Sequence, residues 1–263
     1  MGGTQPLSSP AGSDIAPLEH LPEIAGADGA KLSAFFAPLL GHFVAETVRT
    51  GGTVWLYRPA GRVDGILLRR DAERIGSIFA ASPGAAEALF RARGDLAVFS
   101  EYRVNDGEPE IFPVYAADLS SPPVLHRFAH TIRAAQPADV PRLIRLMREV
   151  YGGIDERWLR ALPHPDEHGF VAEIEGRIVG VAWVTVVGST GRLHSLSVAP
   201  RFRRLGVGTD LWHARAMFAR SVGAHRLLTE IAESNSASRA IASAGGMRRI
   251  GQLFEYARPA QSA

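Results

Sequence analysis

The sequence predicts a mixed α/β protein in which short strands alternate with helices in two successive sets. Three observations lead to this class. Apolar residues recur at helical spacing over residues 32–49 and 138–151, short apolar runs lie between Gly- and Pro-bearing turns, and Pro122-Pro123 separates the two sets. A chain of 263 residues suits one large domain or two of ordinary size. We therefore expect two α/β domains that meet between residues 120 and 130.

The first set begins with the helix over residues 32–49, which Gly51-Gly52 ends. Ser82 caps a second helix that runs to about residue 93, with Pro83 in its first turn. Residues 1–28 are rich in Gly, Ser, Pro and Ala and offer little apolar surface to bury, so we expect a flexible segment there and a first domain over 29–125. Strands are expected at residues 53–57, 63–68, 74–79, 96–100 and 111–115.

The second set, over residues 126–263, alternates more regularly. Glu175-Gly176-Arg177 predicts a hairpin turn. Helices are expected at residues 138–151, 205–221 and 235–244, and strands at 131–134, 170–174, 178–187, 193–198, 227–231 and 249–256. This order indicates a mixed sheet of about 130 residues, which is an ordinary domain size.

Composition excludes several classes of function. The chain has no cysteine, so disulfides, thiolate metal sites and a cysteine nucleophile are ruled out, and a reducing, cytoplasmic location is expected. No apolar run reaches the ~20 residues of a membrane span, and the N-terminus lacks the pattern of a signal peptide. A formal net charge of +2 with mixed signs argues against a nucleic-acid-binding face. A local basic cluster at Arg201, Arg203 and Arg204 still indicates an anion site.

That cluster lies in the segment with the clearest chemical meaning. An extended run ends at Pro200, and a basic turn with Gly206 and Gly208 then opens a helix. The first turn of a helix offers free N–H groups and the positive end of its dipole, and glycine lets a ligand approach the backbone. The segment therefore predicts a pyrophosphate cradle. A P-loop would need Gly-Lys-Ser/Thr, and a dinucleotide fingerprint would need a third glycine where Leu211 stands.

The pattern Val198-x-Pro200-x-x-Arg203-x-x-Gly206-x-Gly208 resembles the acetyl-CoA-binding motif of the GNAT acetyltransferases, and the resemblance extends over residues 131–256. It implies a GNAT-type, mostly antiparallel sheet flanked by helices, with acetyl-CoA or another acyl-CoA as co-substrate. In this family the motif strand pairs with the pantetheine arm, the following amides hold the pyrophosphate, and an Asn after the next strand contacts the cofactor. The residues so implied are Leu196, Ser197, Val198, Arg203, Arg204, Leu205, Gly206, Val207, Gly208, Thr209 and Asn235.

The proton-transfer groups depart from the family pattern. His194 stands where GNAT enzymes often carry a Glu, and an imidazole with a pKa near ~6.5 suits a base at neutral pH. Glu230 and Glu233 are alternatives, and Glu173 is a weaker one. Ala242 stands where the family often has a Tyr, so Tyr256, Ser236 or water is left as the leaving-group acid.

The resemblance implies transfer of an acetyl or short acyl group to a primary amine of a small molecule or peptide, by a monomer or homodimer that binds neither membrane nor nucleic acid. A catalytically weak acyl-CoA-binding regulatory protein is the alternative. Residues 151–169 are expected to border the acceptor, and the segment 164–168 (HPDEH) is read as a solvated loop rather than a metal site. Residues 32–116 repeat the order of the second set without its glycine motif, which suggests a degenerate GNAT-like half, as in glycine N-acyltransferase-like proteins.

Overall fold

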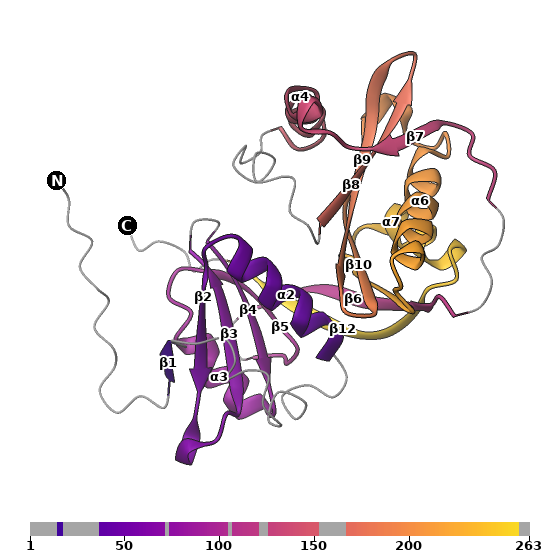
Figure 1. The fold of residues 1–263 in the computed structure, drawn as a ribbon. Coiled ribbons are helices and arrows are strands. Elements are labelled where there is room, and N and C mark those ends of the chain that lie inside the picture. Colours follow the sequence, from indigo (N-terminus) through magenta and orange to yellow (C-terminus); the bar gives the residue numbers. More distant parts are fainter. Residues whose placement is uncertain are drawn as a thin grey trace. The chain divides into compact units, whose positions relative to one another are not determined.

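A computed structural model of the chain describes residues 15–17, 37–71, 74–104, 107–120, 126–152 and 167–257. Its contacts fall into two units, one made of Met1–Glu110 with Phe254–Ala263 and the other of Ile111–Leu253. Each unit is built on a mixed, mostly antiparallel sheet flanked by helices, as the sequence predicts (Figure 1). Among the described residues, no helix combines the length and apolar character that a membrane span requires.

In the first unit, the helices α2 and α3 pack on opposite faces of the sheet. Phe43 of α2 packs on Phe79, whereas Leu89 of α3 lies against Gly65, which is on the other face. Neighbouring strands run antiparallel except β4 and β5, which run parallel. The elements are α2 (Ala37–Arg49), η2 (Pro59–Gly61), α3 (Pro83–Arg91) and, in order across the sheet, β1 (Ile15–Pro17), β2 (Thr53–Tyr57), β3 (Gly65–Arg70), β4 (Ile75–Ala80), β5 (Ala97–Ser100) and the end of β12 (Arg248–Tyr256).

The second unit has the same strand directions, with β10 and β11 as its parallel pair. Its helical elements are η3 (Pro137–Asp139), α4 (Val140–Tyr151), η4 (Pro200–Phe202), α6 (Val207–Ser221) and α7 (Ser236–Ala244). Its strands, in order across the sheet, are the part of β12 up to Leu253, β6 (Glu110–Asp118), β11 (Arg226–Glu230), β10 (Thr190–Val198), β9 (Arg177–Val187), β8 (Glu167–Ile174) and β7 (Thr131–Ala134).

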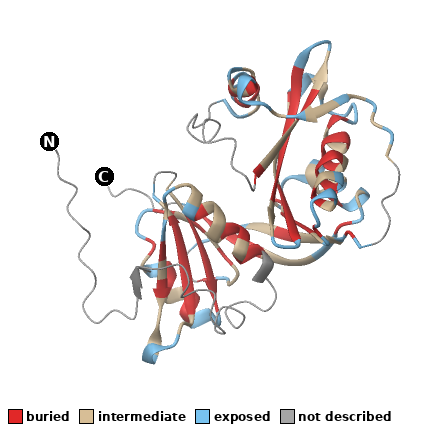
Figure 2. Ribbon diagram, in the orientation of Figure 1, coloured by how far each residue is buried: buried red, intermediate tan, exposed pale blue. Residues whose placement is uncertain are grey.

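The two faces of this second sheet have separate cores. Trp183 on β9 packs with Leu143 and Met147 of α4. Leu193 on β10 packs with Trp212 of α6 on the opposite face, because successive side chains of a strand alternate between faces. Figure 1 accordingly shows α4 on one side of the strands and α6 and α7 on the other. Buried residues run along the central strands and the inner side of α6 (Figure 2).

The contact-based units differ from the boundary near residue 125 that the sequence suggests. β6 precedes that boundary but pairs with β11 in the second unit, and Phe254–Tyr256 pairs with β5 in the first. Long-range strand pairing of this kind leaves no local mark in a sequence. Within the segment 1–28 that is predicted to be flexible, residues 15–17 form β1 on β2, and the other residues of that segment lie outside the described part.

Candidate acyl-transfer site

The site begins where two parallel strands separate. β10 pairs with β11 only from Thr190↔Arg226 to Arg192↔Leu228, after which no further pairing joins the two described strands. On its other edge β10 stays paired with β9 as far as Val198↔Gly180. The later part of β10 therefore has one open edge. Because the Ala199 N–H bonds to Val179 of β9, the N–H of Val198 points to that open edge.

A bulge in β10 accompanies the separation. The register with β9 shifts between His194 and Ser197, and Ser195 has a φ of 52°, which is a strained value for a residue with a side chain. Buried Arg215 of α6 braces this point by donating hydrogen bonds to the carbonyls of Trp183 and His194. Burial lowers the pKa of Arg215 to about 9, so the side chain stays charged at neutral pH.

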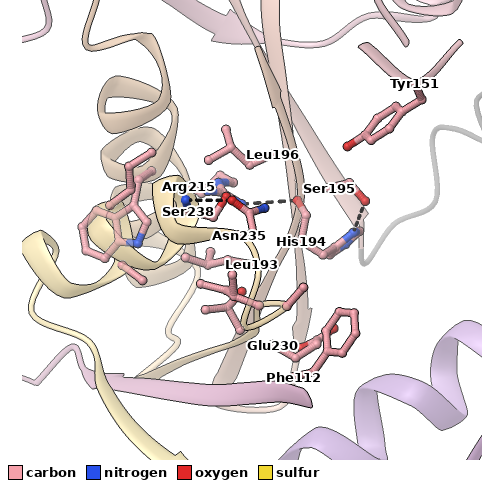
Figure 3. Close-up of a pocket in the computed structure, with 16 residues that line it drawn as sticks. Phe112, Tyr151, Leu193, His194, Ser195, Leu196, Arg215, Glu230, Asn235 and Ser238 are labelled. Carbon is pink, nitrogen blue, oxygen red and sulfur yellow. Dashed lines mark hydrogen bonds between the residues drawn. The ribbon is translucent and has the colours of Figure 1, made fainter. Parts of the chain in front are cut away.

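A cavity of about 210 Å³ lies at the point of separation. Its lining residues come from both strands and from the helices on both faces (Figure 3). His194 and Ser195 of β10 and Tyr151 of α4 lie on one side, and Leu196, Asn235 and Arg215 on the other. A group that reaches the bulge can therefore contact side chains from both faces of the sheet.

The first turn of α6 borders the open edge of β10. Its N-cap is Gly206, with a φ of 87° and no side chain, so the N-cap residue does not cap the first N–H groups of the helix. Arg203 donates to the Val198 carbonyl, which ties the turn to the end of β10. Arg201 and Arg204 are exposed beside it. Free N–H groups, a helix dipole and cations together suit a phosphate group.

The two motif glycines serve different purposes. Gly206 is required by its backbone conformation, because a Cβ there would meet no atom closer than 3.8 Å. At Gly208 a Cβ would lie 2.8 Å from Cδ1 of Ile241 on α7, so a larger residue there would displace the end of that side chain. The prediction that both glycines let a ligand approach the backbone stays a prediction.

Buried Asp210 anchors the start of α6. Its carboxylate lies 2.6 Å from Nε2 of His126 and 2.7 Å from Nδ1 of His130, and it accepts the N–H groups of Ala129 and His130. Burial raises the pKa of Asp210, but the four hydrogen bonds outweigh burial and lower it overall. The carboxylate thus fixes the first turns of α6 to the segment before β7.

His194 projects from the bulge onto the face that α4 covers. Its Nε2 lies 2.9 Å from Oγ1 of Thr185 and 3.5 Å from Oε1 of Glu167, and its Nδ1 lies 3.2 Å from Oγ of Ser195. His194 therefore lines the cavity, with a carboxylate near one ring nitrogen and a cavity-lining hydroxyl near the other.

The other predicted acid–base residues lie in different surroundings. Glu230 lines the cavity, but its Oε1 is held by the guanidinium of Arg192. Glu233 is about half exposed and lies 3.9 Å from Arg249, and Glu173 binds Arg133 and Arg142, which lower its pKa. Glu233 and Glu173 are not brought into the cavity.

Tyr256 is also not brought into the cavity. It is buried in the first unit, where its hydroxyl accepts the N–H of Val104 and donates to the carbonyl of the same residue. The cavity is lined instead by Tyr151, whose hydroxyl lies 3.0 Å from Oγ of Ser197. Nothing in the sequence around Tyr151 singles it out, because its role depends on where the end of α4 lies.

Two further residues that the sequence analysis singles out, Asn235 and Ala242, line the cavity. Asn235 caps α7 by accepting the Ser238 N–H, and it lines the cavity, so its structural and site roles are compatible. Ala242 lines the cavity at the position where a phenol was expected and is absent. Ser236 begins α7 and is exposed.

The segment predicted to border the acceptor is described only in part, since residues 153–166 lie outside the described ranges. The reading of Glu167 as part of a solvated loop is wrong. It begins β8, pairs with Thr185, and its side chain has no exposed surface. Within the described ranges, no group of three or more His, Asp or Glu side chains is arranged to hold a metal ion.

The model of the acetyltransferase (GNAT) family matches residues 134–245, which include the open strand, the turn and the Asn235 helix. These residues form a GNAT acetyltransferase domain. A comparison with curated protein sequences gives no significant match.

Solved structures share the fold of this GNAT domain and of the chain around it. A GCN5-related N-acetyltransferase from Sphaerobacter thermophilus is 14% identical with a TM-score of 0.63, over 97% of this chain and 99% of its own. A GNAT-family acetyltransferase from Colwellia psychrerythraea is 13% identical with a TM-score of 0.65, over 93% and 99%. A GCN5-related N-acetyltransferase from Kribbella flavida is 15% identical with a TM-score of 0.53, over 75% and 87%.

Proposed function

We propose that the GNAT domain transfers an acetyl or short acyl group from acyl-CoA to a primary amine by direct attack on the thioester. The observation that carries the proposal is the separation of β10 from β11 at Arg192, which leaves an open strand edge that leads to the uncapped start of α6. An extended arm can add to such an edge through backbone hydrogen bonds, while its phosphates bind the helix start.

In this proposal the cofactor-binding residues divide into two groups. Leu196, Ser197 and Val198 hold the pantetheine arm together with Asn235, and the turn from Arg203 to Thr209 holds the pyrophosphate, with Leu205 and Val207 contributing backbone only. The fit rests on the N–H of Val198, which points to the open edge, and on the absence of a side-chain cap at Gly206. Acyl-CoA supplies the activated acyl group, and no metal has a part in the reaction.

The chain's own groups then account for the proton transfers. The Val198 N–H stabilises negative charge on the thioester oxygen. His194 accepts a proton from the attacking amine, and Glu230 is the alternative base. Tyr151 replaces Tyr256 as the candidate donor to the leaving thiol, because its hydroxyl lies beside Ser197 at the cavity. The acceptor is a small-molecule or peptide amine.

Thiol release from acetyl-CoA with a panel of primary amines tests this function. His194→Ala should abolish most turnover at neutral pH and regain part of it at high pH, where the free amine needs no base. His225→Ala is the matched control, since His225 is an exposed histidine of the same unit. Unchanged turnover in His194→Ala would show that His194 is not the base and would favour Glu230. Tight CoA binding without turnover of any amine would favour an acyl-CoA-binding regulatory protein, which the alanine at position 242 also favours.

A further inference from the structure

A row of polar side chains crosses the α4 face of the second sheet. Glu167 on β8 pairs with Thr185 on β9, Thr185 pairs with Arg192 on β10, and His194 follows two residues later on the same face. The sheet register thus places a carboxylate, a hydroxyl and an imidazole side by side. The carboxylate is remote in sequence from the motif and has no part in the function proposed above.

We propose that Glu167 is a positioning residue for His194, which it holds in the tautomer with the proton on Nε2 and with Nδ1 directed at the cavity. The inference rests on the proposed role of His194 as the base. Glu167 touches no substrate and acts only through the imidazole.

The distances favour this tautomer. Oε1 of Glu167 lies 3.5 Å from Nε2 of His194, and Oγ1 of Thr185 lies 2.9 Å from the same nitrogen. An ionised carboxylate beside an Nε2 lone pair is repulsive, whereas beside an Nε2–H it is attractive. Nδ1 is then the unprotonated nitrogen. Nδ1 accepts a hydrogen bond from the hydroxyl of Ser195, whose Oγ lies 3.2 Å away (Figure 3). Ser195 also lines the cavity.

Burial makes the coupling strong. The side chain of Glu167 has no exposed surface and that of His194 is 11% exposed. A carboxylate in such surroundings is stabilised chiefly by a positive partner, and a proton taken up by the imidazole supplies one. When the amine attacks, its proton moves to Nδ1 while the new C–N bond forms and the C–S bond breaks. The imidazolium that results lies against the Glu167 carboxylate, so the charge that develops is neutralised at once.

Other groups near His194 do not account for the stabilisation of the charged imidazole. Arg192, two residues before it on the same face, is neutralised by Glu230 of β11. Arg215 approaches from α6 and binds the His194 carbonyl, and it is present in both the wild type and the variants proposed below. Tyr151 of α4 lines the same cavity with its hydroxyl at Ser197. The carboxylate of Glu167 lies within ion-pair distance of the imidazole.

Nitrogen-15 NMR of the His194 imidazole in the full chain tests the inference without any assay of activity. The wild type should show the Nε2-protonated tautomer above its titration midpoint. In Glu167→Gln the midpoint should fall by about one to three pH units, because the carboxylate no longer favours the charged ring. Glu149→Gln is the control, since it removes a partly exposed carboxylate that pairs with Arg177 at the surface. An Nδ1-protonated wild type, or a midpoint equal in Glu167→Gln and wild type, would overturn the inference.

Steady-state kinetics distinguish a positioning role from a loss of folded structure. Glu167→Gln should lower kcat by about 10²-fold while the KM for acyl-CoA stays unchanged, and the acid limb of its pH profile should move to lower pH. Glu167→Asp keeps the charge and should recover part of kcat, which covers the case in which the amide variant folds poorly. A KM rise equal to the kcat loss would contradict a positioning role. If wild type turns over no amine, the proposed function fails, and the tautomer still decides this inference.

Discussion

The two units contain the same strand–turn–helix, and only one of them has the features of a cofactor site. In the first unit β4 pairs with β3 without a shift from Ile75 to Ala80 and with β5 over four residues from Ile75 to Ile78. In the second unit β10 carries a bulge and leaves β11 after Arg192. The same order of strands and helices therefore does not give the same site, because the site forms where the two parallel strands separate.

The starts of α3 and α6 also differ, and again only the second unit has a feature of a cofactor site. The side chain of Ser82 accepts the Ala85 N–H, so the start of α3 satisfies part of its own hydrogen-bonding need. Gly206 leaves the start of α6 without such a cap, and exposed arginines surround it. We infer that the first unit is a degenerate GNAT-like half whose helix start is closed by its own chain. A comparison between matched variants of the two turns can test this.

The largest effect is expected from a charge placed at the uncapped turn. Gly206→Glu puts an anion where the pyrophosphate is proposed to bind and removes about two charge-assisted hydrogen bonds, so CoA affinity should fall on the order of 10³-fold. The unfavourable φ of 87° adds a loss of about 1–2 kcal/mol in the free energy of unfolding. Titration calorimetry with CoA and urea denaturation measure the two effects separately.

Gly84→Glu is the matched control in the first unit. Gly84 lies in the first turn of α3, where a Cβ would meet no atom within 4 Å. CoA affinity should be unchanged, and the wild type should bind one CoA per chain. Two equivalent CoA sites per chain, or equal losses in the two variants, would break the distinction between the units.

A smaller effect on binding but a clear one on stability is expected at the anchor of α6. Asp210→Asn keeps the shape of the side chain but removes the charge that His126 and His130 contact, and breaking such a buried pair costs about 3 kcal/mol. Urea denaturation at neutral pH should show this loss. α6 should then hold its first turn less firmly, with a modest fall in CoA affinity.

The pH dependence of this loss follows from the lowered pKa of Asp210. The unfolded chain takes up the proton at a higher pH than the folded chain does. The stability that Asp210 contributes is therefore complete above the ordinary Asp pKa of about 3.9 and is lost as pH falls through the folded value. The difference between wild type and Asp210→Asn should shrink below about pH 4. A difference that stayed constant into acid would show that the anchor depends on shape rather than charge.

Local features of the fold could be predicted from the sequence, since short-range periodicity and punctuation determine them. The strand at residues 53–57 is observed as β2, Gly152 ends α4 in the left-handed conformation, and Ser82 caps α3. The resemblance to the GNAT motif predicts His194 from its place on the motif strand and Asn235 from its place after the next strand. The strand, the helix end and the cap depend on residues within a few positions of each other.

The remaining features depend on partners that are distant in sequence. Glu167 reaches His194 only through the registers of β8 with β9 and of β9 with β10, and a shift by one residue would turn it to the opposite face. The sequence predicts Tyr256 in the site because it is a phenol on the last expected strand, but the end of that strand pairs with β5. Neither register nor pairing partner can be read from one sequence without its contacts.

The smallest expected effect concerns the capped turn and tests whether the cap alone closes the first unit. Ser82→Ala removes the side-chain acceptor of the Ala85 N–H and should cost about 1 kcal/mol in urea denaturation, whereas Ser82→Gly should cost only a few tenths. Neither variant should bind a second CoA, because β4 stays paired with β5 as far as Ile78, which leaves only its last two residues, Phe79 and Ala80, without a partner on β5. A second CoA bound by Ser82→Gly would mean that the cap, and not the strand pairing, separates the two units in function.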